Sequence, residues 1–286
     1  MTNSTRAYLN LLFISLLWGG TFPIIKNAVI NIDPFTFVSI RFLLAALLFI
    51  IFIIKKLPTL NRQLIISGLI LGLLNAATYT TQTIGLKYIS ASRSAFITGV
   101  YIFFVPLIAV LFKIERFSLL NLCAALLCIY GLYILTGSNI SHISYGDILT
   151  VICALSCAIS IVYLQHISAV HPDYKSLCFY QILFTAPVPG IIAFKTGHLN
   201  ELFHLPVIFA FFYCIIFATI FTLYLQTKYQ KYSTATTAAL IFSLEPVFAT
   251  LISIFIYGEM MTKNIMVGGA VMLASVILPE LIRVNL

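Results

Sequence analysis

The sequence has little charge. Only 8% of its 286 residues are Asp, Glu, Lys or Arg, whereas 61% are hydrophobic and the mean hydropathy is +1.08. Soluble domains usually carry about 25% charged residues, so this composition excludes an ordinary soluble domain and indicates an integral membrane protein. Because the apolar runs are continuous rather than alternating, they favour membrane-spanning helices, which satisfy their own backbone hydrogen bonds.

Motifs for several kinds of chemistry are also lacking. The sequence contains no nucleotide-binding loop and no His-Glu-x-x-His zinc motif, and its five histidines lie in or beside predicted loops. Its six cysteines lie in apolar segments without a Cys-x-x-Cys pair, so they predict neither a disulfide framework nor a metal site. We therefore expect no cofactor, and an intramembrane enzyme is the least favoured class.

Ten apolar segments are each close to the roughly 20 residues that a helix needs to cross the hydrocarbon core of a bilayer. In order, they are residues 7–30, 34–54, 64–86, 91–112, 117–136, 146–168, 176–194, 206–227, 234–257 and 264–282. The loops between them are short, which leaves no room for a soluble domain. The fold class predicted from this pattern is all-α and integral to the membrane, with ten transmembrane helices.

The two halves of the chain resemble each other. An offset of 144 residues aligns Glu115 with Glu259, each just past a span, and an offset of 138 residues aligns the first span with the sixth. Each glutamate is expected to cap a helix start or to pair with a neighbouring base. Residues 7–137 and 146–283 are therefore predicted to be two five-helix repeats. Since five is an odd number, the second repeat is inverted relative to the first, which is typical of secondary transporters.

Lysine and arginine counts predict the orientation. With the N-terminus in the cytoplasm, ten of these residues, including Lys55 and Lys56, fall on the inner side and five on the outer side. This excess agrees with the positive-inside rule, so we expect both termini to be cytoplasmic. The net charge of +8 then orients the protein and contacts anionic lipid head groups. We expect no nucleic acid partner.

Three runs of residues carry a family resemblance. They are WGGTFP at residues 18–23, the Asp33-Pro34 pair followed by RFLLAA at residues 41–46, and SLEPVF at residues 243–248. Together they resemble the drug/metabolite transporter superfamily, in its ten-helix EamA-type branch, over essentially the whole chain. The resemblance implies two inverted five-helix repeats in a bacterial inner membrane. It also implies a small-molecule substrate, often an amino acid or a relative, which leaves the cell.

The first half departs from the family pattern at two places. It has Lys-Ile-Glu-Arg at residues 113–116, where a Gly-Glu pair is common, and Ile102 where the second half has Pro246. These departures weaken the symmetry between the halves but leave the resemblance intact.

Candidate substrate-binding residues share one depth in the membrane. At about 1.5 Å of rise per residue, five side chains from five spans lie roughly 14 to 17 Å inside a core about 30 Å thick. They are Trp18, Asn75, Tyr101, Ser156 and Glu245. Because this depth is the midplane, where inverted repeats form their site, we predict that these side chains surround the substrate.

Glu245 is the most informative of these residues, since no other acidic residue lies deep in a predicted span. A charge there costs several kcal/mol unless it is paired, hydrated or protonated. Pro246 follows it and removes a backbone hydrogen bond, which predicts a polar notch in the helix. Three roles stay open. Glu245 carries a proton, attracts an ammonium group, or forms a buried ion pair with Arg41, which lies at a similar depth.

Other residues of the predicted site have two interpretations each. Gly19 and Gly20 permit either the bending that alternating access needs or plain close packing. Trp18 and Tyr101 would hold a cationic group by cation-π contact. Thr21 and Gln82, like Asn75, either bind substrate or join helices.

The function predicted from these observations is a secondary carrier that exports amino acids or related small metabolites by alternating access. Uptake of a metabolite and proton-coupled export of cationic drugs are the alternatives. The expected partners are the substrate, protons and the lipid bilayer. The sequence does not distinguish a monomer from a homodimer.

Overall fold

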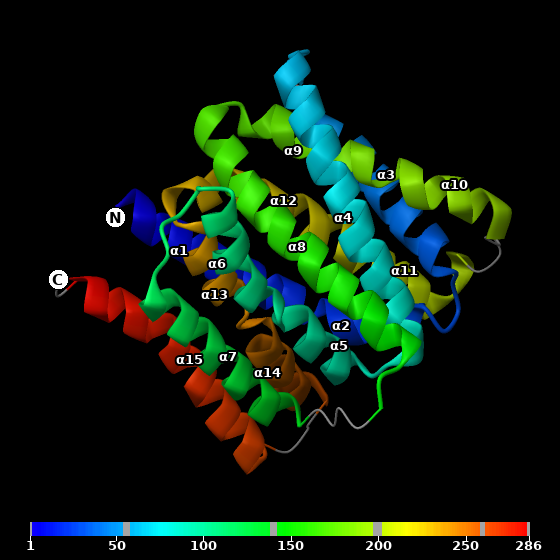
Figure 1. Ribbon diagram of the computed structural model, residues 1–286. Helices are drawn as coiled ribbons and strands as arrows, with labels where there is room; N and C mark the ends of the chain where they lie inside the picture. Colours follow the sequence, from blue (N-terminus) through cyan, green and yellow to red (C-terminus); the bar gives the residue numbers. More distant parts are fainter. Residues whose placement is uncertain (1, 54–57, 138–141, 197–201, 258–260, 285–286) are drawn as a thin grey trace.

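The computed structural model describes residues 2–53, 58–137, 142–196, 202–257 and 261–284. Lys55, Lys56 and Glu259, which were named above, lie outside these residues. Within the described ranges the chain is helical apart from turns and short loops, and it contains no strand (Figure 1). The all-α class predicted from continuous apolar runs is therefore confirmed.

The helices follow one another with short connections. In chain order they are α1 (Asn3–Gly19), α2 (Thr21–Ala28), α3 (Pro34–Phe52), α4 (Arg62–Tyr88), α5 (Ala91–Gly99), α6 (Tyr101–Leu111), α7 (Leu119–Thr136), α8 (Tyr145–Val170), α9 (Tyr174–Thr185), α10 (Pro187–Thr196), α11 (Leu205–Ile215), the π-helical turn η2 (Ile216–Phe221), α12 (Thr222–Tyr229), the 3-10 turn η3 (Gln230–Tyr232), α13 (Ala235–Phe242), α14 (Glu245–Tyr257) and α15 (Lys263–Val284).

These helices combine into spans that agree with the predicted ones. In the described part of the chain, nine helical segments are long and apolar enough to cross a membrane: Asn3–Ala28, Pro34–Phe52, Arg62–Tyr88, Ala91–Leu111, Leu119–Thr136, Tyr145–Val170, Tyr174–Lys195, Leu205–Tyr232 and Ala235–Ile252. A further apolar helix, Lys263–Pro279, is shorter and corresponds to the tenth predicted span. The two ends of the chain lie on the same side of the bundle (Figure 1), as an even number of crossings requires.

Besides the interruptions at Ala186, between α9 and α10, and at η2, three spans are broken. α1 and α2 meet at Gly20, α5 and α6 meet at Val100, and Ser243 and Leu244 separate α13 from α14. The offset of 144 residues places Val100 opposite Leu244, so two of the breaks occupy equivalent positions in the two repeats. The break in this span therefore lies at Ser243 and Leu244, slightly before Pro246, where the sequence predicted a notch. Pro246 itself is in the first turn of α14, where its missing N–H removes no helical hydrogen bond.

The two repeats interlock through close helix contacts. α4 lies along α8 and α9, and α7 lies along α15 (Figure 1). Glycines make these contacts possible, because a Cβ on Gly72 would lie 2.6 Å from Phe184 Cβ, and one on Gly268 would lie 2.6 Å from Gly131 O. Gly72 and Gly268 therefore allow the close packing of helices from the two repeats.

Polar contacts at the ends of the spans also join the two repeats. Arg93 on α5 forms an ion pair with Asp147 on α8, with Nε 2.6 Å from Oδ1 and Nη2 2.7 Å from Oδ2. Glu115 accepts hydrogen bonds from Thr236 N at 3.1 Å and from Thr236 Oγ1 at 2.6 Å, at the start of α13. Of the two roles expected for Glu115, the structure therefore shows the capping of a helix start.

Gly19 provides a test of the packing between α1 and α14. A Cβ at this position would lie 2.7 Å from Glu245 O and 2.9 Å from Ala249 N, and these backbone atoms cannot rotate away. We expect Gly19→Ala to lower the free energy of unfolding by about 1–3 kcal/mol, measured by thermal unfolding in detergent. Gly269→Ala is the matched control, because its Cβ would meet only side-chain carbons at 3.9 Å. Equal midpoints for the two variants would contradict the close approach.

Candidate functional site

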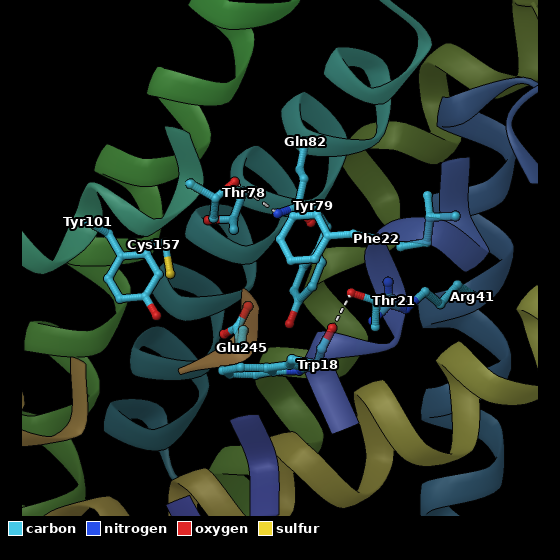
Figure 2. A pocket seen from close by; sticks show the side chains of 12 residues that line it. Trp18, Thr21, Phe22, Arg41, Thr78, Tyr79, Gln82, Tyr101, Cys157 and Glu245 are labelled. Carbon is cyan, nitrogen blue, oxygen red and sulfur yellow. Dashed lines mark hydrogen bonds between the residues drawn. The ribbon is translucent and has the colours of Figure 1, made fainter. Parts of the chain in front are cut away.

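A small cavity of about 50 Å³ lies beside the breaks at Gly20, Val100 and Leu244 (Figure 2). Eight helices, α1 to α6, α8 and α14, supply the lining residues Trp18, Thr21, Phe22, Ile25, Arg41, Thr78, Tyr79, Gln82, Thr98, Tyr101, Cys157 and Glu245.

Six of the eight residues predicted from the sequence line this cavity. They are Trp18, Thr21, Arg41, Gln82, Tyr101 and Glu245. The structure adds six residues for which no role was predicted, namely Phe22, Ile25, Thr78, Tyr79, Thr98 and Cys157. A common depth identified Trp18, Tyr101 and Glu245, whereas Arg41 was named as a possible partner of Glu245, and Thr21 and Gln82 were named for their polar side chains. Most of the six added residues carry no such signal in the sequence.

Asn75 and Ser156, in contrast, do not line the cavity. Asn75 precedes Thr78 by about one helical turn, and its Oδ1 accepts a hydrogen bond from Ser160 Oγ of α8 at 3.4 Å. Ser156 immediately precedes Cys157, so its side chain points about 100° away around the helix. The depth estimate along the helix axis was therefore wrong by one turn for Asn75, and for Ser156 it carried no information about which side of the helix faces the cavity.

Glu245 begins α14 at the cavity. Its side chain is 9% exposed, and its carboxylate has no hydrogen-bond or ion-pair partner among the residues that the structure describes. The N-terminal end of a helix carries a partial positive charge, which favours an anion at this position. Glu245 is therefore a buried acceptor that is free to bind a proton or a cationic group.

Tyr101 occupies the equivalent position in the first repeat. The offset of 144 residues aligns it with Glu245, and it is the first residue of α6, as Glu245 is of α14. The Tyr101 hydroxyl is buried and has no hydrogen-bond partner. Two equivalent helix starts, one from each repeat, thus present a phenol and a carboxylate to the same cavity (Figure 2). Applied to the candidate site residues, this offset would have shown from the sequence alone that Tyr101 and Glu245 are equivalent positions.

Arg41 lies on the opposite side of the cavity from Tyr101 (Figure 2). It is 1% exposed, and it donates from Nε to Thr219 Oγ1 at 2.8 Å and from Nη2 to Ala218 O at 3.0 Å. The ring of Tyr79 lies 4.7 Å from its guanidinium carbon. Its third nitrogen, Nη1, is buried without a partner.

Arg41 and Glu245 form no ion pair with each other. In the described part of the chain, the ion pair present is the one between Arg93 and Asp147. The static Arg41–Glu245 pair that was considered from the sequence is therefore absent, although both side chains line one cavity. The cavity consequently holds one acidic and one basic side chain, and each has unused hydrogen-bonding capacity.

Trp18 and Gln82 both line the cavity and join helices. Trp18 Nε1 donates to Ala218 O at 3.3 Å, and Gln82 Nε2 donates to Thr98 Oγ1 at 3.2 Å. Thr21 Oγ1 donates to Trp18 O at 2.7 Å, which satisfies a carbonyl at the break between α1 and α2. The role of joining helices, one of the two interpretations for Gln82, is therefore visible in the structure.

The cavity is closed on one side and extends toward the other. On the closed side, Ser15 Oγ of α1 donates to Ile241 O of α13 at 2.8 Å, and the ring of Trp18 meets that of Phe242 edge-on at 5.1 Å. Ile25 and Gln82 line the cavity in the opposite direction, near the ends of α2 and α4. The cavity thus extends from the breaks at Gly20, Val100 and Leu244 toward the end of the bundle where α5 begins.

Comparison with known proteins gives consistent results. A model of the EamA-like transporter family matches residues 5–137 and 144–279. An uncharacterized transporter of Archaeoglobus fulgidus is 33% identical over 275 residues, which cover 96% of this chain and 86% of that protein. The uncharacterized transporter YoaV of Bacillus subtilis is 23% identical over 177 residues, covering 58% of this chain and 61% of that protein. A crystal structure that covers 97% of both chains has a TM-score of 0.79 at 15% identity, a likeness of fold alone.

Proposed function

Because the chain belongs to the EamA-like transporter family, within the drug/metabolite transporter superfamily, we propose that it is a secondary carrier for amino acids or closely related zwitterionic metabolites. The observation that supports this substrate class most directly is the pair of opposite charges in one cavity. Glu245 offers a carboxylate without a partner, and Arg41 offers the unpaired Nη1 of its guanidinium. A zwitterion carries a complementary group for each.

The two ends of an amino acid would bind at different places in the cavity. The ammonium group would pair with Glu245, and the rings of Trp18 and Tyr101, which line the same cavity, would add cation-π attraction. The carboxylate would accept hydrogen bonds from Arg41, whose planar guanidinium suits carboxylate geometry. A purely cationic drug would leave the Arg41 charge unpaired, which makes proton-coupled drug export the weaker candidate.

Alternating access would use the broken spans. The breaks at Gly20, at Val100 and at Leu244 all adjoin the cavity, and a break in a helix lets its two halves change their mutual angle. Opening the contact of Ser15 with Ile241 while closing the opposite side would expose the substrate to the other face of the membrane. With both termini in the cytoplasm of a bacterial cell, as the lysine and arginine counts predict, the cavity described above extends outward, a state that importers and exporters share. The direction proposed, export, follows from the family resemblance.

Glu245 also provides a route to energy coupling. A carboxylate at the midplane is stable only if it is hydrated, protonated or paired with a cation. In the proposed cycle, Glu245 binds a proton in the absence of substrate and exchanges it for the ammonium group when substrate enters. Proton entry would then drive export of the amino acid.

Flux into proteoliposomes tests this proposal. A panel of radiolabelled amino acids and organic cations is presented with and without an imposed pH gradient, and protein-free vesicles serve as the control. We expect saturable flux of at least one amino acid, and we expect the gradient to change its rate. Flux of organic cations alone would favour the drug-export alternative. Chemical conversion of a panel compound without flux would instead support an intramembrane enzyme, a function that the family assignment disfavours.

A further inference from the structure

The π-helical turn η2 does not line the cavity, but it binds two side chains that do, Trp18 and Arg41. η2 (Ile216–Phe221) interrupts the span between α11 and α12. In a π turn, backbone hydrogen bonds span five residues instead of four, so the turn is wider and its carbonyls leave the regular pattern. The carbonyl of Ala218, inside this turn, accepts hydrogen bonds from two side chains of other helices, Arg41 of α3 and Trp18 of α1.

Thr219, the next residue of the turn, completes the contact. Its Oγ1 accepts the hydrogen bond from Arg41 Nε at 2.8 Å, next to the bond from Nη2 to Ala218 O at 3.0 Å. Nε and Nη2 form one edge of the guanidinium, so the turn binds that whole edge. Thr219 is fully buried and does not line the cavity.

The remaining geometry leaves one free edge on Arg41. The Tyr79 ring lies 4.7 Å and the Phe42 ring 5.2 Å from the guanidinium carbon, and both restrict how the group rotates. Nη1 has no partner in the protein. A guanidinium held along one edge by a fixed turn and restricted by two rings presents its other donors in a single orientation, as recognition of a planar two-oxygen anion requires.

We propose that Thr219 is a positioning residue, which orients Arg41 so that its Nη1 edge binds the carboxylate of the substrate. The π turn would thereby select compounds that carry a carboxylate over otherwise identical amines. This inference depends on the proposed function, because it assigns one end of the zwitterion to a defined donor edge. Thr219 acts through Arg41 and does not itself contact the substrate.

The experiment compares amino acids with their decarboxylated amines, beginning with leucine and 3-methylbutylamine and with phenylalanine and phenethylamine. Binding to the purified protein in nanodiscs is measured for the wild type, for Thr219→Val and for Thr219→Ser. Thr219→Val keeps the shape of the side chain but removes the acceptor. It should weaken amino acid binding by about tenfold, since a hydrogen bond to a charged group is lost, and it should leave amine binding unchanged. Thr219→Ser retains the hydroxyl and should restore amino acid binding.

Thr222→Val is the matched control. Thr222 is also a fully buried threonine of the same span, but its hydroxyl donates to Thr219 O and has no hydrogen bond to Arg41. The Thr222→Val variant should bind each amino acid and its decarboxylated amine as the wild type does. Equal losses for the amino acid and its amine in Thr219→Val, no loss for either, or failure of Thr219→Ser to restore binding would overturn the inference. A wild-type protein that binds no amino acid of the panel would overturn the proposed function, and the inference with it.

Discussion

Glu245→Gln is expected to reduce amino acid transport by about 100-fold, which corresponds to about 3 kcal/mol for the loss of one partner of a buried charge pair. The substitution keeps the size of the side chain but removes the charge that would hold the substrate ammonium group. Since the Glu245 carboxylate has no partner among the described residues, its replacement leaves no other protein group unpaired. Initial rates of flux into proteoliposomes measure the effect, and the rate should no longer respond to an imposed pH gradient.

Glu115→Gln is the matched control for this experiment. Glu115 caps the start of α13 through Thr236 and does not line the cavity, so the variant should transport at the wild-type rate. The emission of Trp18, the one tryptophan of the sequence, reports whether the cavity of each variant is intact. If Glu245→Gln transports at the wild-type rate with an unchanged response to the pH gradient, the proposed role of the carboxylate is wrong.

Arg41→Met is expected to have a comparably large but more selective effect. The methionine side chain follows that of arginine as far as Nε and is apolar, as the neighbouring Phe42 and Tyr79 rings favour, but it has neither charge nor donors. Amino acid binding should fall by about 100-fold, as expected when one partner of a buried charge pair is removed. Binding of the corresponding amines should persist, because their ammonium group would still meet Glu245. Competition binding in nanodiscs with the same amino acid and amine pairs measures this difference.

Arg62→Met serves as the control for removal of an arginine, because Arg62 is exposed at the start of α4. The comparison of the two cavity variants is the sharper test. Glu245→Gln should weaken amino acids and amines alike, whereas Arg41→Met should weaken amino acids alone. If both variants lose binding of the same compounds, the two ends of a zwitterion do not bind at separate places in the cavity.

Composition and segment length were sufficient to predict the architecture. Continuous apolar runs of about 20 residues can satisfy their backbones in lipid only as helices, and the structure contains such helices at the predicted places. The position of the polar break was predicted less accurately. Pro246 marked the right span, but α13 ends before Ser243, because a proline is tolerated in the first turn of a helix and the break itself need not contain one.

Polarity and approximate depth along a helix predicted six of the residues that line the cavity. The sequence did not show which side of each helix faces the cavity. Glu245 was identifiable because an acidic residue within an apolar run requires compensation wherever the neighbouring helices lie. Asn75 and Ser156 had the same apparent depth, but Asn75 lies one turn before Thr78 on the same face of α4, and Ser156 faces away from the cavity beside Cys157. The level of the cavity and the side of α8 that faces it both depend on how the helices pack together.

The sequence by itself determined that this protein lies in the membrane as two related sets of spans, and it predicted one acidic residue well inside a span. These features follow from local composition, since each span must be apolar, long enough to cross the bilayer and able to satisfy its own backbone hydrogen bonds. Only the tertiary structure decided that Arg41 is held by Ala218 and Thr219 and is not paired with Glu245. The physical reason is that hydrogen bonds between helices far apart in the chain depend on lateral packing and on a π turn, and apolar periodicity encodes neither.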